Sequence, residues 1–455
     1  METFSNLVAT VDSFMWGPWL LVFLVGTGIF LTIRLGFLQF FKLPYALKLA
    51  FSPSKQDRQS EGDISHFQAL MTALAATIGT GNIVGVATAF VLGGPGAVFW
   101  MWITAIFGMA TKYGEAVLSV KFRTVDEKGE MAGGPMFYIE KGLGWKWLAV
   151  LFAFFGSVAA FGIGNLVQIN SVAGNMSTTF GIRPQITGII LTIFTAIVVL
   201  GGVKSIGRWS SLIVPFMAVF YILGGLYIIF ANLELLGPAF SVIFTSAFSA
   251  KAGLGALIGS TIRYGVARGL FSNEAGMGSA PIAAAAAKTD HPCRQGLVSM
   301  TGTFLDTIVV CSITGISLVM ASISGFTGSG DTAALTSQSF QYFMPFGNII
   351  VTIALLFFAY STVLGWSYYG EKCFYYLVGQ KGIIPYRVFF CALVYVGAIS
   401  QLDLVWSIAD TFNAAMCIPN LIALLALSGI IVAETKDFNQ LRVEEIKQEK
   451  ASRSA

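Results

Sequence analysis

The chain has 455 residues, of which 55 % are hydrophobic and 11 % are charged, and its mean hydropathy is +0.75. A soluble domain usually carries about 25 % charged residues, so this composition excludes an ordinary soluble protein and indicates a polytopic helical membrane protein. The formal net charge is only +4, and no block of basic residues suggests a nucleic-acid partner. The five cysteines show no CxxC spacing and there are only two histidines, so the sequence offers no zinc site.

Long apolar runs predict eleven transmembrane helices, because about 20 apolar residues are needed to cross a bilayer. The predicted spans are 16–33, 66–92, 96–120, 147–173, 185–203, 209–231, 254–284, 297–325, 347–371, 388–403 and 405–433. The N-terminus lacks a positively charged signal region, so the first span (within residues 1–35) is expected to be retained. The tail from Glu434 is expected to form a few helical turns and then to be disordered.

The basic residues predict the orientation of these spans. With the N-terminus outside and the C-terminus inside, 22 of the 27 Lys and Arg fall in the inner loops and the tail, and only Arg183 and Lys251 fall in the outer loops. Lys and Arg concentrate on the cytoplasmic side of membrane proteins. The sequence therefore predicts a multi-pass protein of a prokaryotic cytoplasmic (inner) membrane, in contact with its lipids.

The second span carries the first anomaly, the sequence Gly-Thr-Gly-Asn at residues 79–82. Glycine costs about 1 kcal/mol in a helix, and Thr and Asn compete for backbone hydrogen bonds. Hydrocarbon cannot satisfy the N–H and C=O groups that a break would free, so such groups must line a cavity or hold a ligand. The alternative is a seam of small residues through which two helices pack closely.

The seventh span carries a second anomaly, because Arg263, Arg268, Asn273 and Glu274 lie among its small residues. Ionisable groups at this depth usually face a cavity or one another. Spans 2–6 and 7–11 form two sets of five, and an odd number of spans gives the two sets opposite orientations. The sequence therefore predicts inverted repeats at residues 66–231 and 254–433. Interrupted helices at corresponding positions, spans 2 and 7, favour a central binding site over the packing seam.

Four motifs in this order resemble the alanine/glycine:cation symporter family, a group within the LeuT-like superfamily. They are TIGTGNIVG at 77–85, GNLVQIN at 164–170, GLFSNEAGMG at 269–278 and STVLGW at 361–366. The resemblance extends over nearly the whole chain. It implies an all-α integral membrane protein with a five-plus-five inverted repeat and one extra N-terminal helix. It also implies sodium-driven uptake of small neutral amino acids such as alanine and glycine by alternating access.

The expected substrate site lies where spans 2 and 7 meet spans 4 and 9. The residues expected to bind substrate are Gly79, Thr80, Gly81, Asn82, Gln168, Phe271, Ser272, Asn273, Thr362 and Trp366. Backbone N–H groups at the start of a half-helix can hold a carboxylate, and free carbonyls at the other break can accept from an ammonium. The residues alone favour an interhelical hydrogen bond as the role of Gln168, and the resemblance instead implies that it contacts the substrate. Trp366 is bulky enough to close a pocket around a methyl group.

Sodium is the expected coupling ion, and no organic cofactor is expected. Its expected ligands are Ala75, Ile78, Asn82, Asn273, Ser361 and Thr362. Adjacent hydroxyls at 361 and 362 that face the break in span 2 would add to its carbonyl oxygens. The alternative is that both hydroxyls bond back to the carbonyls of their own helix.

Several buried charges are expected to be structural. Lys112 and Glu115 are one turn apart and are expected to pair, and Glu274 is expected to pair with Arg263 or Arg268. Asp306 and Asp410 are the remaining buried acids, each either a relay for protons or cations or a structural partner.

The leading functional hypothesis is a sodium-driven symporter rather than an enzyme. The sequence contains no GxxxxGK[ST] motif and no soluble domain to hold one, so ATP is not the expected energy source. A proton-coupled transporter of the same fold is the nearest alternative. A channel, which would need pore-lining rings from several subunits, is a more distant one.

Overall fold

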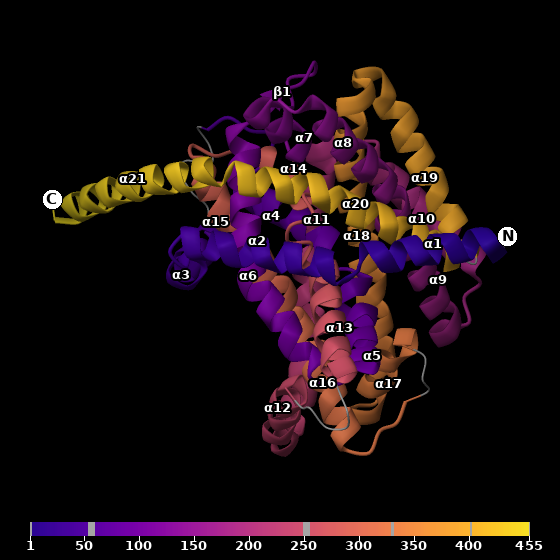
Figure 1. Cartoon of the computed structure of the whole chain (residues 1–455). Coiled ribbons are helices and arrows are strands. Elements are labelled where there is room, and N and C mark those ends of the chain that lie inside the picture. Colours follow the sequence, from indigo (N-terminus) through magenta and orange to yellow (C-terminus); the bar gives the residue numbers. More distant parts are fainter. Residues whose placement is uncertain (1, 53–59, 249–254, 329–331, 401–402, 455) are drawn as a thin grey trace.

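The computed structural model describes residues 2–52, 60–248, 255–328, 332–400 and 403–454, and Figure 1 shows the whole chain. Four positions that the predictions above used lie outside the described residues. They are Lys55, Arg58 and Lys251, which were counted among the loop charges, and residue 254, the start of the seventh span. Helices form nearly all of the described part. A short antiparallel hairpin pairs β1 (Thr124–Val125) with β2 (Met131–Ala132).

Every predicted span falls on one to three consecutive helical elements. The first half contains α1 (Glu2–Met15), α2 (Pro18–Arg34), α3 (Leu38–Phe51), α4 (His66–Thr77), η2 (Gly81–Gly85), α5 (Val86–Gly93), α6 (Ala97–Lys121), α7 (Pro135–Tyr138), η3 (Ile139–Leu143), α8 (Lys146–Phe161), η4 (Gly162–Leu166), α9 (Val167–Phe180), α10 (Pro184–Val199), α11 (Gly202–Ala231) and α12 (Leu233–Phe248). The second half contains α13 (Gly255–Asn273), α14 (Ala280–Ala285), α15 (Pro292–Thr303), η5 (Phe304–Cys311), α16 (Ser312–Ile323), α17 (Thr332–Phe343), α18 (Gly347–Val378), η6 (Gln380–Gly382), α19 (Ile383–Ile399), α20 (Asp403–Ala426) and α21 (Ser428–Ser454).

Seven continuous helices in the described part are long and apolar enough to cross a membrane, and the bent pair α4 and α5 makes an eighth span. The remaining predicted spans fall on other helices. α10 is apolar but has only 16 residues. α6 has 25 residues and carries Lys112, Glu115 and Lys121, and the seventh span is divided between α13 and α14. The chain is therefore a multi-pass membrane protein.

The predicted break in the second span is confirmed. α4 begins at a capping box, in which the Ser65 hydroxyl accepts from the Gln68 amide and the Gln68 side chain accepts from the Ser65 amide. The helix ends at Thr77, and Ile78 is extended with φ −77° and ψ 92°. The two halves of the span then meet at an angle of 53°.

The predicted break in the seventh span is also confirmed. α13 ends at Asn273 and α14 begins at Ala280, so six residues between them are not helical. Gly276 and Gly278 have φ values of +88° and +81°, which glycine adopts without the steric cost that a Cβ would bring. Glu274 also has a positive φ of 55°, which is uncommon for a residue with a side chain.

The two sets of five spans pack as corresponding pairs. α5 packs against α13, α6 against α15, α8 against α18 and α10 against α19, which joins spans 2 and 7, 3 and 8, 4 and 9, and 5 and 10. Pairing of equivalent helices is the arrangement that an internal pseudo-two-fold axis produces. The five-plus-five architecture thus places the two broken spans together near the middle of the bundle.

Large apolar side chains remain exposed on the outer helices. On α11 they are Leu212, Phe216, Val219, Leu223 and Phe230. Continuous apolar surface of this kind is expected where a helix contacts lipid.

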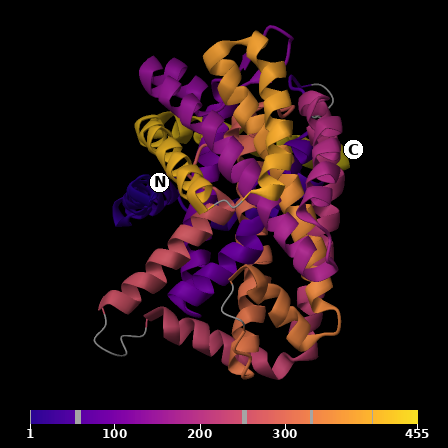
Figure 2. The ribbon, with the colours of Figure 1, turned by 90° about the vertical axis from the view of Figure 1, so that its right-hand side faces the viewer.

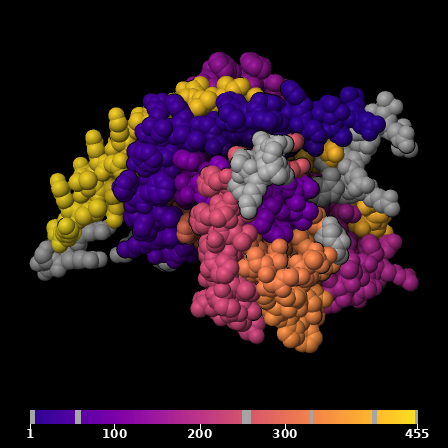
Figure 3. Space-filling model, turned by 60° about the horizontal axis from the view of Figure 1, so that its bottom comes forward, coloured from indigo at the N-terminus to yellow at the C-terminus, as the bar shows by residue number. Residues whose placement is uncertain are grey.

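Two segments lie outside this bundle. The short apolar segment α12 runs across one end of the molecule, at a large angle to α11 (Figure 2). α21 projects from the opposite part of the molecule (Figure 1), while α1 and α2 form a continuous indigo ridge across the face shown in Figure 3.

The prediction of a short tail helix followed by disorder is wrong, because α21 begins at Ser428 and continues to Ser454. Two ion pairs hold it against the bundle, Lys121 with Glu434 at 2.8 Å and Arg294 with Glu445 at 2.7 Å. Its composition is rich in Glu, Lys and Gln, which are good helix formers.

Candidate functional site

Residues of four spans meet at the break in the second span. A Cβ added to Gly79 would lie 2.4 Å from the Thr362 hydroxyl and 3.1 Å from the Gln168 side-chain oxygen, so only glycine fits between them. The Thr80 amide donates to that same Gln168 oxygen at 3.2 Å. A Cβ on Gly81 would lie 3.2 Å from the Cα of Ser272. The predicted substrate residues on α4–η2, α9, α13 and α18 are therefore brought together.

Five oxygen atoms converge on one side of this break. The Ser361 hydroxyl lies 3.3 Å from the Ala75 carbonyl, and the Thr362 hydroxyl lies 3.4 Å from the Ile78 carbonyl. Both hydroxyls also lie within 3.0 Å of the Phe358 carbonyl on their own helix. The two predicted alternatives are thus compatible, because the hydroxyls bond back along α18 and still face the break. The Phe358 carbonyl was missed, although a Ser or Thr that bonds back to its own helix points to it.

Asn82 and Asn273 lie in a second group of polar side chains, which surrounds Asp306. The Asn82 side-chain oxygen accepts from the Gly79 amide at 2.9 Å, and its nitrogen donates to the Asp306 carboxylate at 2.7 Å. Ser272 and Thr307 donate to the other oxygen of that carboxylate at 2.9 Å and 2.7 Å. Asn273 donates to the Thr307 hydroxyl at 3.2 Å.

Asp306 is fully buried and was not among the predicted site residues. The signal that could have placed it there is its ionisable side chain in the middle of an apolar span, which by default marks a functional position. Among the described residues it makes no ion pair within 4.0 Å, and its carboxylate oxygens accept from the side chains of Asn82, Ser272 and Thr307.

Three π-helical turns, η2, η4 and η5, follow or adjoin the residues of the site. A π-turn inserts an extra residue into a helix and is frequent at functional sites. η2 begins directly after the break, at Gly81, and η5 contains Asp306 and Thr307. These turns change the direction of the side chains and leave carbonyl groups free for other partners.

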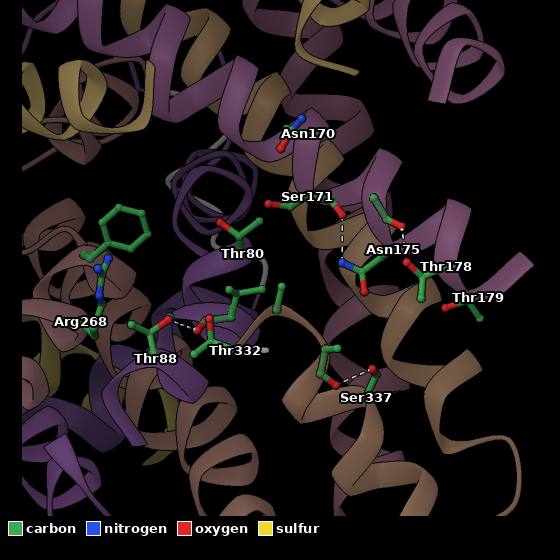
Figure 4. A pocket seen from close by; sticks show the side chains of 16 residues that line it. Thr80, Thr88, Asn170, Ser171, Asn175, Thr178, Thr179, Arg268, Thr332 and Ser337 are labelled. Carbon is green, nitrogen blue, oxygen red and sulfur yellow. Dashed lines mark hydrogen bonds between the residues drawn. The ribbon is translucent and has the colours of Figure 1, made fainter. Parts of the chain in front are cut away.

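A cavity of about 590 Å³ leads to this break from the end of the bundle that carries α17. In Figure 4, Thr80 lies between a wall that carries Arg268 and a wall formed by Ser171, Asn175 and Thr178 of α9. Nine of its sixteen lining residues carry a hydroxyl or an amide side chain. A polar, water-accessible path therefore reaches the break from one side.

The prediction that Glu274 pairs with an arginine is wrong. Arg268 instead lies over the Phe271 ring at 5.6 Å, and it borders a smaller cavity of about 120 Å³ together with Asp12 and Asp410. The Glu274 carboxylate accepts from the Trp366 indole at 2.9 Å and from the Ser279 hydroxyl at 2.5 Å. Its positive φ, directly after the end of α13, is the local conformation in which it makes these contacts.

The predicted pairing of Lys112 with Glu115 is also wrong. Lys112 is 3 % exposed, and its ammonium has no hydrogen-bond partner among the described residues. One Glu115 oxygen accepts from the Gly278 amide at 3.0 Å and from Asn420 at 2.7 Å. The spacing on the helix predicts that Glu115 pairs with Lys112. Glu115 instead accepts from an amide that the break in the seventh span leaves free.

The other side of the site is closed by backbone pairing. The Asp63 amide donates to the Ala286 carbonyl at 2.9 Å, and the Lys288 amide donates to the Ile64 carbonyl at 2.8 Å. These bonds join the segment before the second span to the segment at the end of the seventh. Arg123 donates to the carbonyls of Ala285, Ala287 and Glu61 at 3.1, 2.7 and 3.0 Å. We call this set of contacts between 61–64, Arg123 and 285–288 the backbone clamp.

Charged groups surround the backbone clamp. Lys372 and Asp126 form an ion pair at 3.1 Å, with each side chain 1 % exposed. Burial by itself would raise the pKa of Asp126, but the Lys372 ammonium and the amides of Glu130 and Lys128 outweigh it and hold that pKa below its ordinary value. Burial raises the pKa of the Asp63 carboxyl, although the Met131 amide donates to it.

The sequence matches a family model described as the sodium:alanine symporter family over residues 1–453. It is 67 % identical to the sodium/alanine symporter AgcS of Methanococcus maripaludis over 98 % of this chain and 99 % of that protein. It is 35 % identical to the probable sodium/glutamine symporter GlnT of Bacillus subtilis over 96 % of this chain and 91 % of that protein.

The fold is similar to that of MhsT, which was crystallised in complex with L-phenylalanine. The TM-score is 0.59 at 16 % sequence identity, and the match covers 83 % of this chain and 93 % of MhsT. This likeness confirms the predicted LeuT-like architecture with its broken helices.

Proposed function

Because the chain belongs to the sodium:alanine symporter family, we propose that it carries alanine, and glycine as a second substrate, together with sodium into a prokaryotic cell. It is a sodium-coupled secondary transporter and not an enzyme. The observation that carries the substrate proposal is the convergence of Gly79, Gln168 and Thr362 on the break between α4 and η2.

The carboxylate of the amino acid binds at the residues 79–82, at the start of the outer half-helix. Two amides there already donate to side-chain oxygens, Gly79 to Asn82 and Thr80 to Gln168. The positive end of the half-helix dipole favours an anionic group at this position. The carbonyls of Phe271, Ser272 and Asn273, at the end of α13, accept from the substrate ammonium.

A sodium ion binds among the oxygens of Ala75, Ile78, Phe358, Ser361 and Thr362. Unwound carbonyls together with hydroxyls are the ligands that LeuT-like transporters offer to sodium. Asn82 and Asn273 serve sodium at a different place, beside Asp306, because their side chains bond within that group. The Asp306 carboxylate supplies negative charge there, which compensates a bound cation.

The same residue supports a second candidate function, coupling to protons. Asp306 is a buried carboxylate directly bonded to Asn82, and protonation would neutralise it in place of sodium. This alternative keeps the substrate site and changes only the ion.

Alternating access follows from the two ends of the site. One end opens through the 590 Å³ cavity, and the other is closed by the backbone clamp. We place the cavity on the external side of the cytoplasmic membrane and the backbone clamp on its cytoplasmic side. This orientation agrees with the distribution of Lys and Arg. Transport then requires the clamp to open after both ligands bind.

The test is uptake of radiolabelled alanine and glycine into proteoliposomes, with an inward sodium gradient compared with a potassium gradient at fixed pH. Uptake that depends on sodium supports the proposal. Equal uptake driven by a proton gradient would move the coupling to Asp306. An absence of alanine uptake under every gradient would refute the substrate assignment.

A further inference from the structure

The indole of Trp366 is held on two sides, one of which is a glycine contact. A Cβ added to Gly164 of η4 would lie 2.3 Å from the Cβ of Trp366 and 2.5 Å from its Cγ, so a larger residue at 164 would push the side chain away. Trp366 is one helical turn after Thr362, and it is 2 % exposed. Its ring is also packed edge-on against Tyr369 at 5.7 Å.

The second restraint is the hydrogen bond from the Trp366 indole nitrogen to Glu274 at 2.9 Å. Glu274 is 4 % exposed, and its other oxygen accepts from Ser279, the residue before α14. One carboxylate therefore ties the indole to the non-helical segment of the seventh span. A positive φ at a residue with a side chain is strained and persists where the surroundings fix it, often at functional sites.

The Glu274 side chain accepts at both of its oxygens. One oxygen accepts from the Trp366 indole at 2.9 Å and the other from the Ser279 hydroxyl at 2.5 Å. An indole N–H can only donate, so the orientation of the ring depends on where this acceptor lies. The hydrogen bond therefore fixes the indole in one orientation, in addition to its packing on Gly164 and Tyr369.

We propose that Glu274 is the positioning residue that sets the size limit of the substrate side chain, by holding the Trp366 indole as the wall of the side-chain pocket. The inference rests on the proposed function and on the expectation from the sequence that Trp366, one turn after Thr362, closes the pocket around the substrate methyl group. It assigns to Glu274 no contact with substrate or ion. The wall loses its fixed position when the indole loses this acceptor, and the pocket then admits larger side chains.

The experiment compares kcat/KM for alanine with kcat/KM for 2-aminobutyrate and for threonine in proteoliposomes. The variants are Glu274→Ala, which removes the acceptor, Glu274→Gln, which keeps an oxygen at the same reach, and Trp366→Phe, which removes the donor. Trp102→Phe is the matched control, because that indole donates to Ser312 at 2.8 Å and not to Glu274.

We expect Glu274→Ala and Trp366→Phe each to lower the preference for alanine about ten-fold or more, since one methylene in a pocket is worth about that much discrimination. Glu274→Gln and Trp102→Phe should keep the preference within about two-fold of the wild type. The double variant Glu274→Ala/Trp366→Phe should lower the preference for alanine no further than either single variant does, because both substitutions remove the same hydrogen bond.

An unchanged preference in Glu274→Ala, or the same relaxation in Glu274→Gln as in Glu274→Ala, overturns the proposal. If Glu274→Ala does not fold, Trp366→Phe decides alone, and an unchanged preference there is equally fatal. Stabilisation of the purified wild type by alanine separates the two levels. If alanine neither stabilises nor is carried by the wild type, the proposed function fails. If it does both and the preference never moves, only the role of Glu274 fails.

Discussion

The hydroxyl of Thr362 lies 3.4 Å from the carbonyl oxygen of Ile78, although 284 residues separate them along the chain. Ile78 is the extended residue directly after the end of α4, and Thr362 lies in the buried middle of α18. A broken helix and a continuous helix from opposite halves of the chain therefore share one polar contact. An ion bound there would bridge the two halves, which links its binding to their relative position.

Replacing Thr362 with valine tests this contact. Valine has nearly the same shape as threonine but no hydroxyl, so the packing against Gly79 is kept while one oxygen is lost. We expect the sodium concentration for half-maximal alanine uptake to rise about ten-fold, as for the loss of one polar contact to a charged group. Ser367→Ala is the control, because among the described residues that hydroxyl bonds only to the Leu364 carbonyl of its own helix. An unaltered sodium dependence in Thr362→Val would remove Thr362 from the ion site.

Gln168 tests the substrate side of the same break. Its side-chain oxygen accepts from the Thr80 amide and its nitrogen donates to the Ile163 carbonyl, so the residue fixes the break against η4. We expect Gln168→Ala to reduce alanine uptake by at least about ten-fold at unchanged expression. Asn232→Ala removes a comparable amide that only caps α11, and it should transport normally. Normal uptake by Gln168→Ala would refute the site.

The positions of the breaks could be predicted from sequence because each depends on local chemistry. Gly79 and Gly81 destabilise the helix wherever they stand in it, and a neighbouring Thr and Asn add competing hydrogen bonds. The division into two inverted sets of five spans followed from counting the spans and from their orientation. These are properties of short stretches or of composition, and no tertiary contact is needed to read them.

The partners of the buried charges could not be predicted in this way. Lys112 and Glu115 have the spacing of an ion pair, yet Glu115 bonds to Gly278 and Asn420, more than 160 residues away. Asp306 joined the site for the same reason, since its donors come from three different helical segments. Such choices depend on which amides the break in the seventh span frees, and only the folded arrangement shows that.

Arg123 is expected to control the opening of the backbone clamp. Its guanidinium satisfies three carbonyls from both broken spans, which no single smaller side chain can do. In Arg123→Ala we expect the amides of Asp63, Ile64 and Lys288 to exchange hydrogen about ten-fold faster, because local opening becomes less costly. The measurement is hydrogen–deuterium exchange with mass spectrometry on the purified protein. Lys128→Ala, which changes an exposed basic residue near the same hairpin, should leave these rates unchanged. Equal rates in wild type and Arg123→Ala would contradict this role.

The ion pair of Lys372 and Asp126 should make the folded protein less stable as the pH falls. Asp126→Asn leaves the buried ammonium without its nearest carboxylate, and Glu130 at 3.6 Å replaces it only in part. Breaking a buried pair from one side costs about 3 to 5 kcal/mol, so the variant should unfold at a clearly lower temperature at pH 7. Because the folded protein holds the pKa of Asp126 below its ordinary value, the pair stabilises the wild type above about pH 4 and loses this effect as the pH falls further. Thermal unfolding in detergent from pH 7 to pH 3 should therefore show the unfolding temperatures of Asp126→Asn and wild type converging at the acid end. Glu127→Gln, an exposed neighbour, should track the wild type throughout. A constant gap between Asp126→Asn and wild type across this range would show that the loss of packing, and not of charge, weakens the variant.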